Sequence, residues 1–326
     1  MHPSWLDDAG LFLGHSCPLP LDTPFTFAQA HGLGVNRRSF AALLRSGLIR
    51  PVLRGVYAAA QAPDDLLLRA QALSLVVPEP AVVVDRTAAW LHGVDILPRS
   101  ALHTPPPLDV AHTEESRVRR PGIDGRRRGL LPSDITVVHG VRVTTCLRTA
   151  LDLGRLLWRH DALAAIDGFL RLGLPHEMLL AEIRRFRGYR GVRQLRMLAP
   201  LGDGRAESAG ESALRLFWHD ACLPKPELQY WIYSDEGVGI YRLDIASPEM
   251  RYSAEYDGEE FHTTAEDREH DQLRRTWIAE HRSWVIDPFT KAHVYQPSAD
   301  PVTQLLEGFA AARRGASLWT PRRRSA

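Results

Sequence analysis

The sequence has little lysine and little cysteine, and it contains no long apolar run. Of the 40 basic residues in 326 only Lys225 and Lys291 are lysines, so the positive charge is almost all arginine. Cys17, Cys146 and Cys222 lie far apart, which excludes a disulfide framework and a cysteine-based zinc site. No stretch reaches the roughly 20 apolar residues of a membrane span, and the first residues lack the pattern of a signal peptide. These absences predict a cytoplasmic protein in a reducing compartment.

Composition and length predict several folded domains. With 44% hydrophobic and 24% charged residues, the chain resembles an ordinary globular protein, and its length suits two or three domains. The run Pro200-Leu201-Gly202-Asp203-Gly204 is the clearest boundary. We expect an α/β chain of the α+β multidomain type, with a winged helix-turn-helix (1–62), a mixed α/β middle domain (63–201), a mixed sheet flanked by helices (202–295), and a C-terminal helix with a basic tail (296–326).

The N-terminal pattern is helix, turn, helix and hairpin. Phe25 to Gly32 reads as a helix, and Asn36 is placed to cap a second helix that stops at Gly47. Two β-prone runs, 48–53 and 56–58, are joined through Arg54-Gly55. This order predicts a winged helix, which reads DNA with the start of its second helix and holds phosphates with its wing.

The candidate DNA-binding residues follow from that geometry. They are polar or basic, and they stand at the helix start or in the wing: Asn36, Arg37, Arg38, Ser39, Arg50 and Arg54. Winged helices also serve as protein-interaction modules, and an arginine-flanked helix can simply be a solvated face. A second arginine-rich run, 117–128, is expected to be a solvated loop or a phosphate clamp between domains.

Acidic residues recur in order through the last third of the chain. The pattern there predicts a helix (208–221), three strands (228–233, 240–246, 252–256), a helix (265–281) and a strand (284–286). Glu211 lies on the first helix, Asp244 near the end of the second strand, and Glu255 and Asp257 on the third, with their side chains on the same face. His262 follows on a loop. Such oxygen ligands suit a Mg²⁺ ion that cleaves phosphodiesters.

This ordered set resembles the PD-(D/E)XK nuclease superfamily, and more narrowly a family related to very-short-patch-repair endonucleases. The residues that carry the resemblance lie between about 205 and 290: Glu211–Arg215, Leu228-Gln229, Arg242–Asp244, Glu255–Gly258, His262 and Asp267–Asp271. The resemblance implies a restriction-endonuclease-like domain in which Glu211, Asp244 and Glu255 hold Mg²⁺ or Mn²⁺. Asp257 would take the place of the superfamily lysine, and His262 would act as a base or leaving-group acid. The chain departs from the pattern in lacking that lysine and in having a polar strand before Glu255.

The N-terminal third resembles the winged-helix domain of AbiEi-type antitoxins from bacterial abortive-infection systems. The matching runs are Phe27–Ala30, Leu48–Arg50 and Arg54–Tyr57, and the middle segment adds Gly140–Thr144 and Arg148–Leu153. The resemblance implies DNA binding and a nucleotidyltransferase-like toxin as partner.

Three functions remain open at this point. The first is Mg²⁺-dependent hydrolysis of DNA by the last domain. The second is an AbiEi-like antitoxin or transcriptional autoregulator in which the nuclease fold is inactive. The third is an interaction module without either activity. The carboxylates can also be ordinary strand-end acids that pair with arginines, for which the sequence offers Arg242, Arg251 and Arg268.

Overall fold

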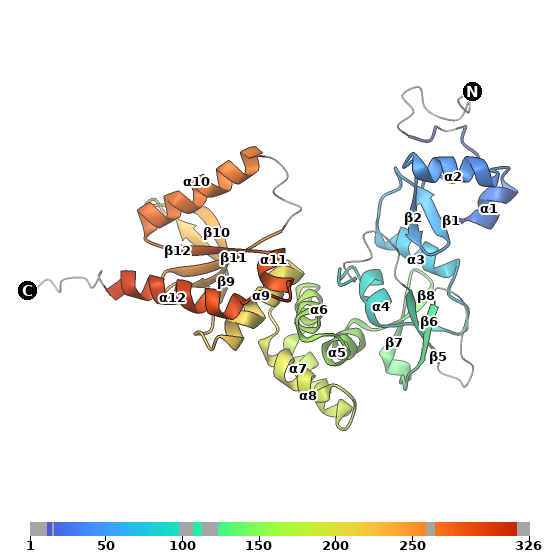
Figure 1. The fold of residues 1–326 in the computed structure, drawn as a ribbon. Coiled ribbons are helices and arrows are strands. Elements are labelled where there is room, and N and C mark those ends of the chain that lie inside the picture. The colour runs from blue at the N-terminus through green and yellow to red at the C-terminus, as the bar shows by residue number, and fades with distance from the viewer. Residues whose placement is uncertain (1–11, 15, 98–106, 113–122, 259–264, 318–326) are drawn as a thin grey trace, which may run out of the picture. The chain divides into compact units, whose positions relative to one another are not determined.

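The computed structural model describes residues 12–14, 16–97, 107–112, 123–258 and 265–317 (Figure 1). His262, the first half of the arginine run 117–128 and the basic tail lie outside these ranges. The chain divides into two compact units, Met1–Leu153 and Gly154–Ala326. In the described ranges, no helix is both long enough and apolar enough to cross a membrane.

The first sheet has three antiparallel strands in the order β1-β3-β2: β1 (Phe25–Thr26), β2 (Ile49–Leu53) and β3 (Val56–Ala59). Two helices precede the β2–β3 hairpin, α1 (Phe27–Gly32) and α2 (Arg37–Arg45). The sequence predicts that the first helix starts at Phe25. It starts after Thr26 instead, because Thr26 and Gln29 form a reciprocal capping box and Phe25 pairs with β3. Helix, helix and hairpin appear in the order of a winged helix.

The second sheet has five mixed strands in the order β6-β5-β4-β8-β7. They are β4 (Val82–Val83), β5 (Leu108–His112), β6 (Ile123–Arg127), β7 (Ile135–Val138) and β8 (Val141–Thr144). Its helices are α3 (Leu66–Ser74), α4 (Asp85–Leu91), the short 3-10 helix η2 (Pro132–Asp134) and α5 (Cys146–Leu156). The sequence interpretation of 116–128 as a loop is wrong for its second half, because β6 pairs in parallel with β5.

The second unit begins with a group of short helices: α6 (Arg159–Arg171), α7 (His176–Glu182), η3 (Ile183–Phe186), α8 (Val192–Leu198) and η4 (Ala199–Leu201). The helix α6, which is buried from Ala162 to Phe169, packs against α9 (Ala209–Asp220). An ion pair between Asp167 of α6 and Arg215 of α9, 2.5 Å apart, is buried between the two helices. This helical group is therefore joined to the sheet that follows.

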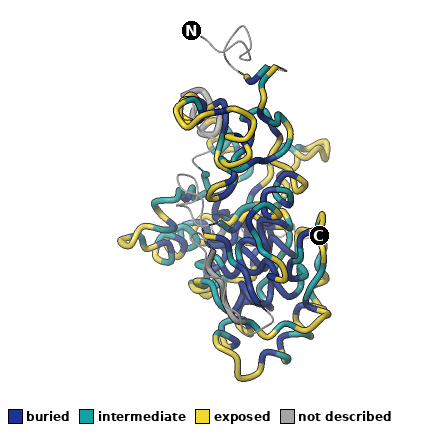
Figure 2. Tube along the Cα trace, turned by 90° about the vertical axis from the view of Figure 1, so that its right-hand side faces the viewer, coloured by how far each residue is buried: buried dark blue, intermediate teal, exposed yellow. Residues whose placement is uncertain are grey.

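The last sheet has the order β12-β11-β10-β9, with three antiparallel strands and β12 parallel to β11. Its strands are β9 (Glu227–Tyr233), β10 (Gly239–Ser247), β11 (Tyr252–Asp257) and β12 (Val285–Thr290). The helix α10 (Ala265–Arg282) covers one face, while α9 and α12 (Pro301–Ser317) cover the other, with the short α11 (Lys291–Tyr295) beside them (Figure 1). Figure 2 shows buried trace in the interior and exposed trace at the outer loops. The predicted α+β multidomain class is confirmed.

Candidate nucleic-acid interface and carboxylate site

The start of α2 is exposed and basic because the helix buries its opposite face. Phe40 and Leu43 enter the core of the first sheet, where the Phe40 ring meets Tyr57 edge-on at 4.8 Å between centroids. Arg37 and Arg38 are exposed, and Ser39 is half-buried. The Asn36 carboxamide oxygen accepts a hydrogen bond from the Ser39 backbone N–H at 2.9 Å, so Asn36 serves the helix as its cap, as the sequence predicts.

The two candidate wing arginines differ in their surroundings. Arg54 is exposed in the turn between β2 and β3, beside Gly55, whose φ of +83° a side chain would strain. Arg50 is half-buried, and its Nη2 donates to the Ala62 carbonyl oxygen at 3.0 Å, which ties β2 to the chain that leaves the hairpin. The structure thus leaves the Arg54 guanidinium open to solvent and gives Arg50 a bracing contact.

Two of the predicted metal ligands, Glu211 and Glu255, lie close enough to Asp244 to affect its ionisation. Extending the pairing of Ile245 with Ala254 by one step places Asp244 of β10 opposite Glu255 of β11. Burial raises the pKa of Asp244 to about 7, and the negative charges of Glu211 and Glu255 add to the rise. Burial also raises the pKa of both Glu211 and Glu255. We call Glu211, Asp244 and Glu255 the carboxylate cluster; Glu255 is buried and the other two are half-buried.

The carboxylates of Glu255 and Asp257 on β11 bind arginines of α10. Arg274 Nη2 lies 2.7 Å from Glu255 Oε2, and Arg275 bonds both Glu255, through Nε at 3.3 Å, and Asp257, through Nη2 at 2.6 and 2.8 Å. The other oxygen of Glu255, Oε1, is buried without a hydrogen-bond partner among the described residues. The sequence proposes Arg242, Arg251 and Arg268 as partners, whereas Arg242 pairs with Glu207 at 2.7 Å.

Gln229 belongs to the same cluster, although sequence reasoning assigns it no role. Its Nε2 donates to Glu211 Oε2 at 2.9 Å, and its Oε1 is buried without a partner in the described part of the chain. Gln229 has a left-handed φ of +56°, unusual for a non-glycine residue in a strand. The pairs Tyr230–Leu243 and Leu228–Ile245 flank it, so Gln229 stands opposite Asp244.

The donor chemistry of the cluster suits a hard cation, but its side chains are not gathered around one. Carboxylate and carboxamide oxygens are the ligands that Mg²⁺ takes, and the buried Oε1 atoms of Gln229 and Glu255 have no hydrogen-bond donor among the residues that the structure describes. Over the ranges that the structure describes, no group of three or more His, Cys, Asp or Glu side chains is placed to hold a metal ion. Glu255 and Asp257 form salt bridges with Arg274 and Arg275 of α10 instead.

Comparison with known proteins places the chain among mycobacterial relatives. It is 38% identical over 244 residues to "Uncharacterized protein MT2308" and to "Uncharacterized protein Rv2248" of two Mycobacterium tuberculosis strains, which covers 74% of this chain and 85% of each relative. The chain belongs to the family of these two proteins. Residues 81–201 also match the model of the AbiEi antitoxin C-terminal domain, and we call this segment the AbiEi domain.

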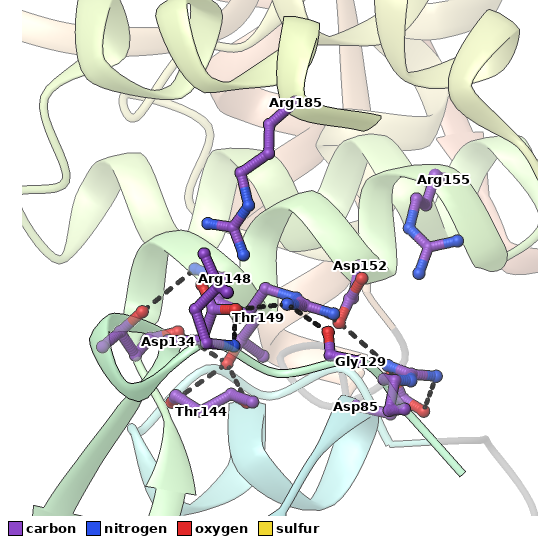
Figure 3. Close-up of polar contacts among 12 residues, drawn as sticks. Asp85, Gly129, Asp134, Thr144, Arg148, Thr149, Asp152, Arg155 and Arg185 are labelled. Atoms are coloured by element: carbon purple, nitrogen blue, oxygen red, sulfur yellow. Dashed lines mark hydrogen bonds and ion pairs between the residues drawn. The ribbon is translucent and has the colours of Figure 1, made fainter. Parts of the chain in front are cut away.

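Within the first unit, the AbiEi domain contains a buried network of alternating charges (Figure 3). Arg128 grips both oxygens of Asp85 at 2.5 and 2.6 Å and reaches Asp152 at 3.0 Å. Arg148 bonds the same Asp152 oxygen at 2.8 Å and Asp134 at 2.5 Å. Each of these five side chains is at most 9% exposed. The network joins the start of α4, the chain after β6, η2 and α5, so the expectation of a solvated loop is wrong for Arg128.

Proposed function

We propose that the protein is a DNA-binding regulator of the AbiEi antitoxin type. The observation that carries this is the AbiEi domain at residues 81–201, which follows in sequence a winged-helix-like segment with exposed basic residues. Arg37 and Arg38 at the N-terminal end of α2 suit base edges and phosphates, and Arg54 in the wing suits phosphates. The proposal includes a nucleotidyltransferase-like toxin as the protein partner, which the resemblance implies.

Binding to the DNA upstream of the protein's own gene tests the regulator. Fluorescence anisotropy with that fragment and a scrambled duplex should show preference for the fragment. Arg37→Ala with Arg38→Ala should weaken binding at least about tenfold and lower the salt slope by about 2, because two phosphate or base contacts are lost. Arg159→Ala with Arg205→Ala removes the same charge from arginines that pair with Asp220 and Asp203, and it should bind like the wild type. Equal affinity of the two double variants would remove the role of α2.

A second candidate function is favoured by the carboxylate cluster: hydrolysis of DNA phosphodiesters with a divalent cation. Two observations support it. Glu211 and Glu255 contribute to raising the pKa of Asp244 to about 7, and the elements follow the order α9-β9-β10-β11-α10-β12. That order agrees with the PD-(D/E)XK resemblance noted in the sequence. Glu211, Asp244 and Glu255 would hold Mg²⁺ or Mn²⁺, with the Gln229 oxygen beside them.

The roles of this chain's own residues follow from their contacts. Bound Mg²⁺ would polarise the scissile phosphate and lower the pKa of a water molecule. Gln229 holds the Glu211 carboxylate in place through its Nε2. Arg275 holds Asp257 through both carboxylate oxygens, so Asp257 could assist a water molecule only after that ion pair opens. His262, proposed as base or leaving-group acid, lies outside the described residues.

Cleavage assays separate the two candidates. Plasmid DNA is incubated with wild type, with Asp244→Asn plus Glu255→Gln, and with the control Asp235→Asn, whose side chain is 89% exposed. The nuclease candidate predicts Mg²⁺- or Mn²⁺-dependent cleavage by the wild type and the control but not by the double variant. If all three leave DNA intact while the wild type still shifts the upstream fragment, the nuclease candidate fails and the regulator stands.

A further inference from the structure

We infer that the segment Ile183–Leu198 of the second unit carries its own binding surface for the phosphate backbone of duplex DNA. Arginines occur there at every third position: Arg184, Arg187, Arg190, Arg193 and Arg196. We call these five residues the arginine stripe. All five are exposed, and they follow one another through η3, the connecting turn and α8. The surface goes beyond the proposed function, which uses α2 and the β2–β3 wing of the first unit.

Local packing decides which side chains of this segment face outward. Ile183, Phe186, Val192, Leu195 and Leu198 are buried, and the stripe occupies positions between them. The apolar residues fix the inner face of η3 and α8, so the arginines are left on the outer face. Their exposure is therefore a consequence of the fold.

The stripe is a local excess of positive charge without acidic neighbours in sequence. The whole chain balances 40 basic against 39 acidic residues, but no Asp or Glu occurs between Glu182 and Asp203. In the part of the chain that the structure describes, the ion pair nearest the stripe in sequence joins Arg185 to Glu182 at 3.5 Å. No ion pair among the described residues includes a stripe arginine. Guanidinium groups so placed repel one another in the free protein, and a polyanion relieves that repulsion.

The backbone beneath the stripe is held in one conformation. Arg155 Nη1 donates to the Arg190 carbonyl oxygen at 3.1 Å, and its guanidinium lies over the rings of Phe186 and Tyr189 at 5.2 and 5.7 Å. Gln194 Nε2 donates to the carbonyl oxygens of Gly154 and Leu157 at 3.0 and 2.9 Å. These contacts tie the turn and α8 to the end of α5. A surface fixed in this way loses little conformational freedom when it binds.

Gly191 allows the turn that carries the stripe to pass close to the backbone of α5. It has a φ of +79°, and a Cβ atom at this position would lie 1.8 Å from the Arg155 carbonyl oxygen. Only glycine lets the chain pass so close to α5 while it turns from Arg190 into α8. The positions of Arg190 and Arg193 thus depend on a specific backbone contact.

Duplex DNA fits the chemistry of this surface better than an acidic protein does. Five exposed guanidinium groups on one short segment suit a polyanion that presents many phosphate oxygens, and arginine binds phosphate through two parallel hydrogen bonds. Binding of this kind is independent of base sequence and weakens as salt rises, because bound counterions are released from the DNA.

The test compares two full-length triple variants with equal loss of charge. Arg187→Gln, Arg190→Gln and Arg193→Gln neutralise the stripe. Arg159→Gln, Arg205→Gln and Arg313→Gln are the control, because the first two pair with carboxylates and Arg313 lies on α12. Anisotropy with a random-sequence 20-bp duplex (a length of about two helical turns) is measured over a salt series, and circular dichroism confirms that both variants fold.

The inference predicts that the stripe variant loses about 2 to 3 from the salt slope and at least about tenfold in affinity at low salt, while the control stays within about twofold of the wild type. Equal slopes for the two variants, or no binding of the duplex by the wild type, would overturn it. Loss of binding to poly-glutamate without any change in DNA binding would overturn it too, in favour of an acidic protein partner.

The same assay separates this inference from the proposed function. Suppose that Arg37→Ala plus Arg38→Ala keeps its preference for the upstream fragment, while the stripe variant has a reduced salt slope. This result would refute the role of α2 and leave the stripe supported. The reverse pattern would refute the stripe and leave α2 supported.

Discussion

At the scale of single residues, the fate of a charged side chain depends on partners that the sequence does not reveal. Arg128 lies in an arginine-rich run that looks solvated, yet it is buried against Asp85, 43 positions earlier, and Asp152, 24 positions later. The acidic order Glu211, Asp244, Glu255 is visible in the sequence because strand alternation and element order are local features. The arginines of α10 that bind Glu255 are not visible, because their approach depends on how the helix is rotated against the sheet.

Asp244 predicts an unusual pH dependence of stability. Its folded pKa of about 7 lies above the ordinary value of 3.8, so the folded state binds the proton more tightly than the unfolded state does. The stabilising contribution is therefore full below about pH 4 and is lost as pH rises through 7. In EDTA, Asp244→Asn should match the wild type at pH 4 and exceed it at pH 8 by on the order of 2 kcal/mol in the free energy of unfolding. Urea denaturation across this range checks it, and a variant that is less stable at pH 8 would contradict it.

The lowered pKa of His160 predicts the opposite pH dependence of stability. Both of its ring nitrogens are buried without a hydrogen-bond partner among the described residues, between Trp158 and Phe217. Burial lowers the pKa of His160 from 6.5 to about 4, so its contribution is present above pH 6.5 and is lost as pH falls towards 4. His160→Phe should remove that loss and add about 1 kcal/mol at pH 7. Thermal unfolding at pH 5 and pH 7 decides the point, since a wild type and variant with parallel pH profiles would refute it.

At the scale of elements, caps and turns are predictable, whereas contacts between distant elements are not. The start of α2 follows from Asn36, and the hairpin of β7 and β8 follows from His139-Gly140, because turn and cap chemistry acts over three or four residues. The left-handed φ of Gln229 and the passage of Gly191 under Arg155 have no such local signal. Both depend on an element far away in sequence.

Gly191 and Gly188 provide a matched pair for testing the turn that carries the arginine stripe. Both have positive φ, but only Gly191 lacks room for a Cβ atom. Gly188→Ala should cost about 1 kcal/mol of stability, as expected for a left-handed alanine. Gly191→Ala should cost about 3 kcal/mol or more, because a backbone clash is added. Thermal or urea unfolding of the two variants gives the difference, and equal costs would show that the close approach to Arg155 contributes nothing.

The buried network of the AbiEi domain should be sensitive to the loss of one member. Arg148→Met removes the cation that pairs with the buried Asp134 and Asp152. The loss should lower the free energy of unfolding by about 3 to 5 kcal/mol. Asp64→Ala removes a half-exposed partner of Arg69 and should cost no more than about 1 kcal/mol. Urea denaturation measures the free energy of unfolding of each variant. Losses that differ by less than about 1 kcal/mol between the two variants would contradict this view of the network.

At the scale of the whole molecule, sequence patterns capture the class and the succession of sheets. The three sheets occupy residues 25–59, 82–144 and 227–290, while the domain bounds 1–62, 63–201, 202–295 and 296–326 expected from the sequence stay a prediction. The division into two compact units after Leu153, inside α5, has no counterpart in the sequence. A continuous amphipathic helix shows no break in its pattern, so composition cannot reveal that its two ends belong to different units.

The central claim is that this relative of the mycobacterial proteins recognises DNA through the exposed start of α2. DNase I footprinting of the region upstream of its gene tests this most directly. The account predicts at least one protected site spanning roughly one helical turn, about 10 bp, with the wild type, and its loss with Arg37→Ala plus Arg38→Ala at the same protein concentration. No protection at concentrations that bind random duplex, or equal protection by the variant, would contradict it.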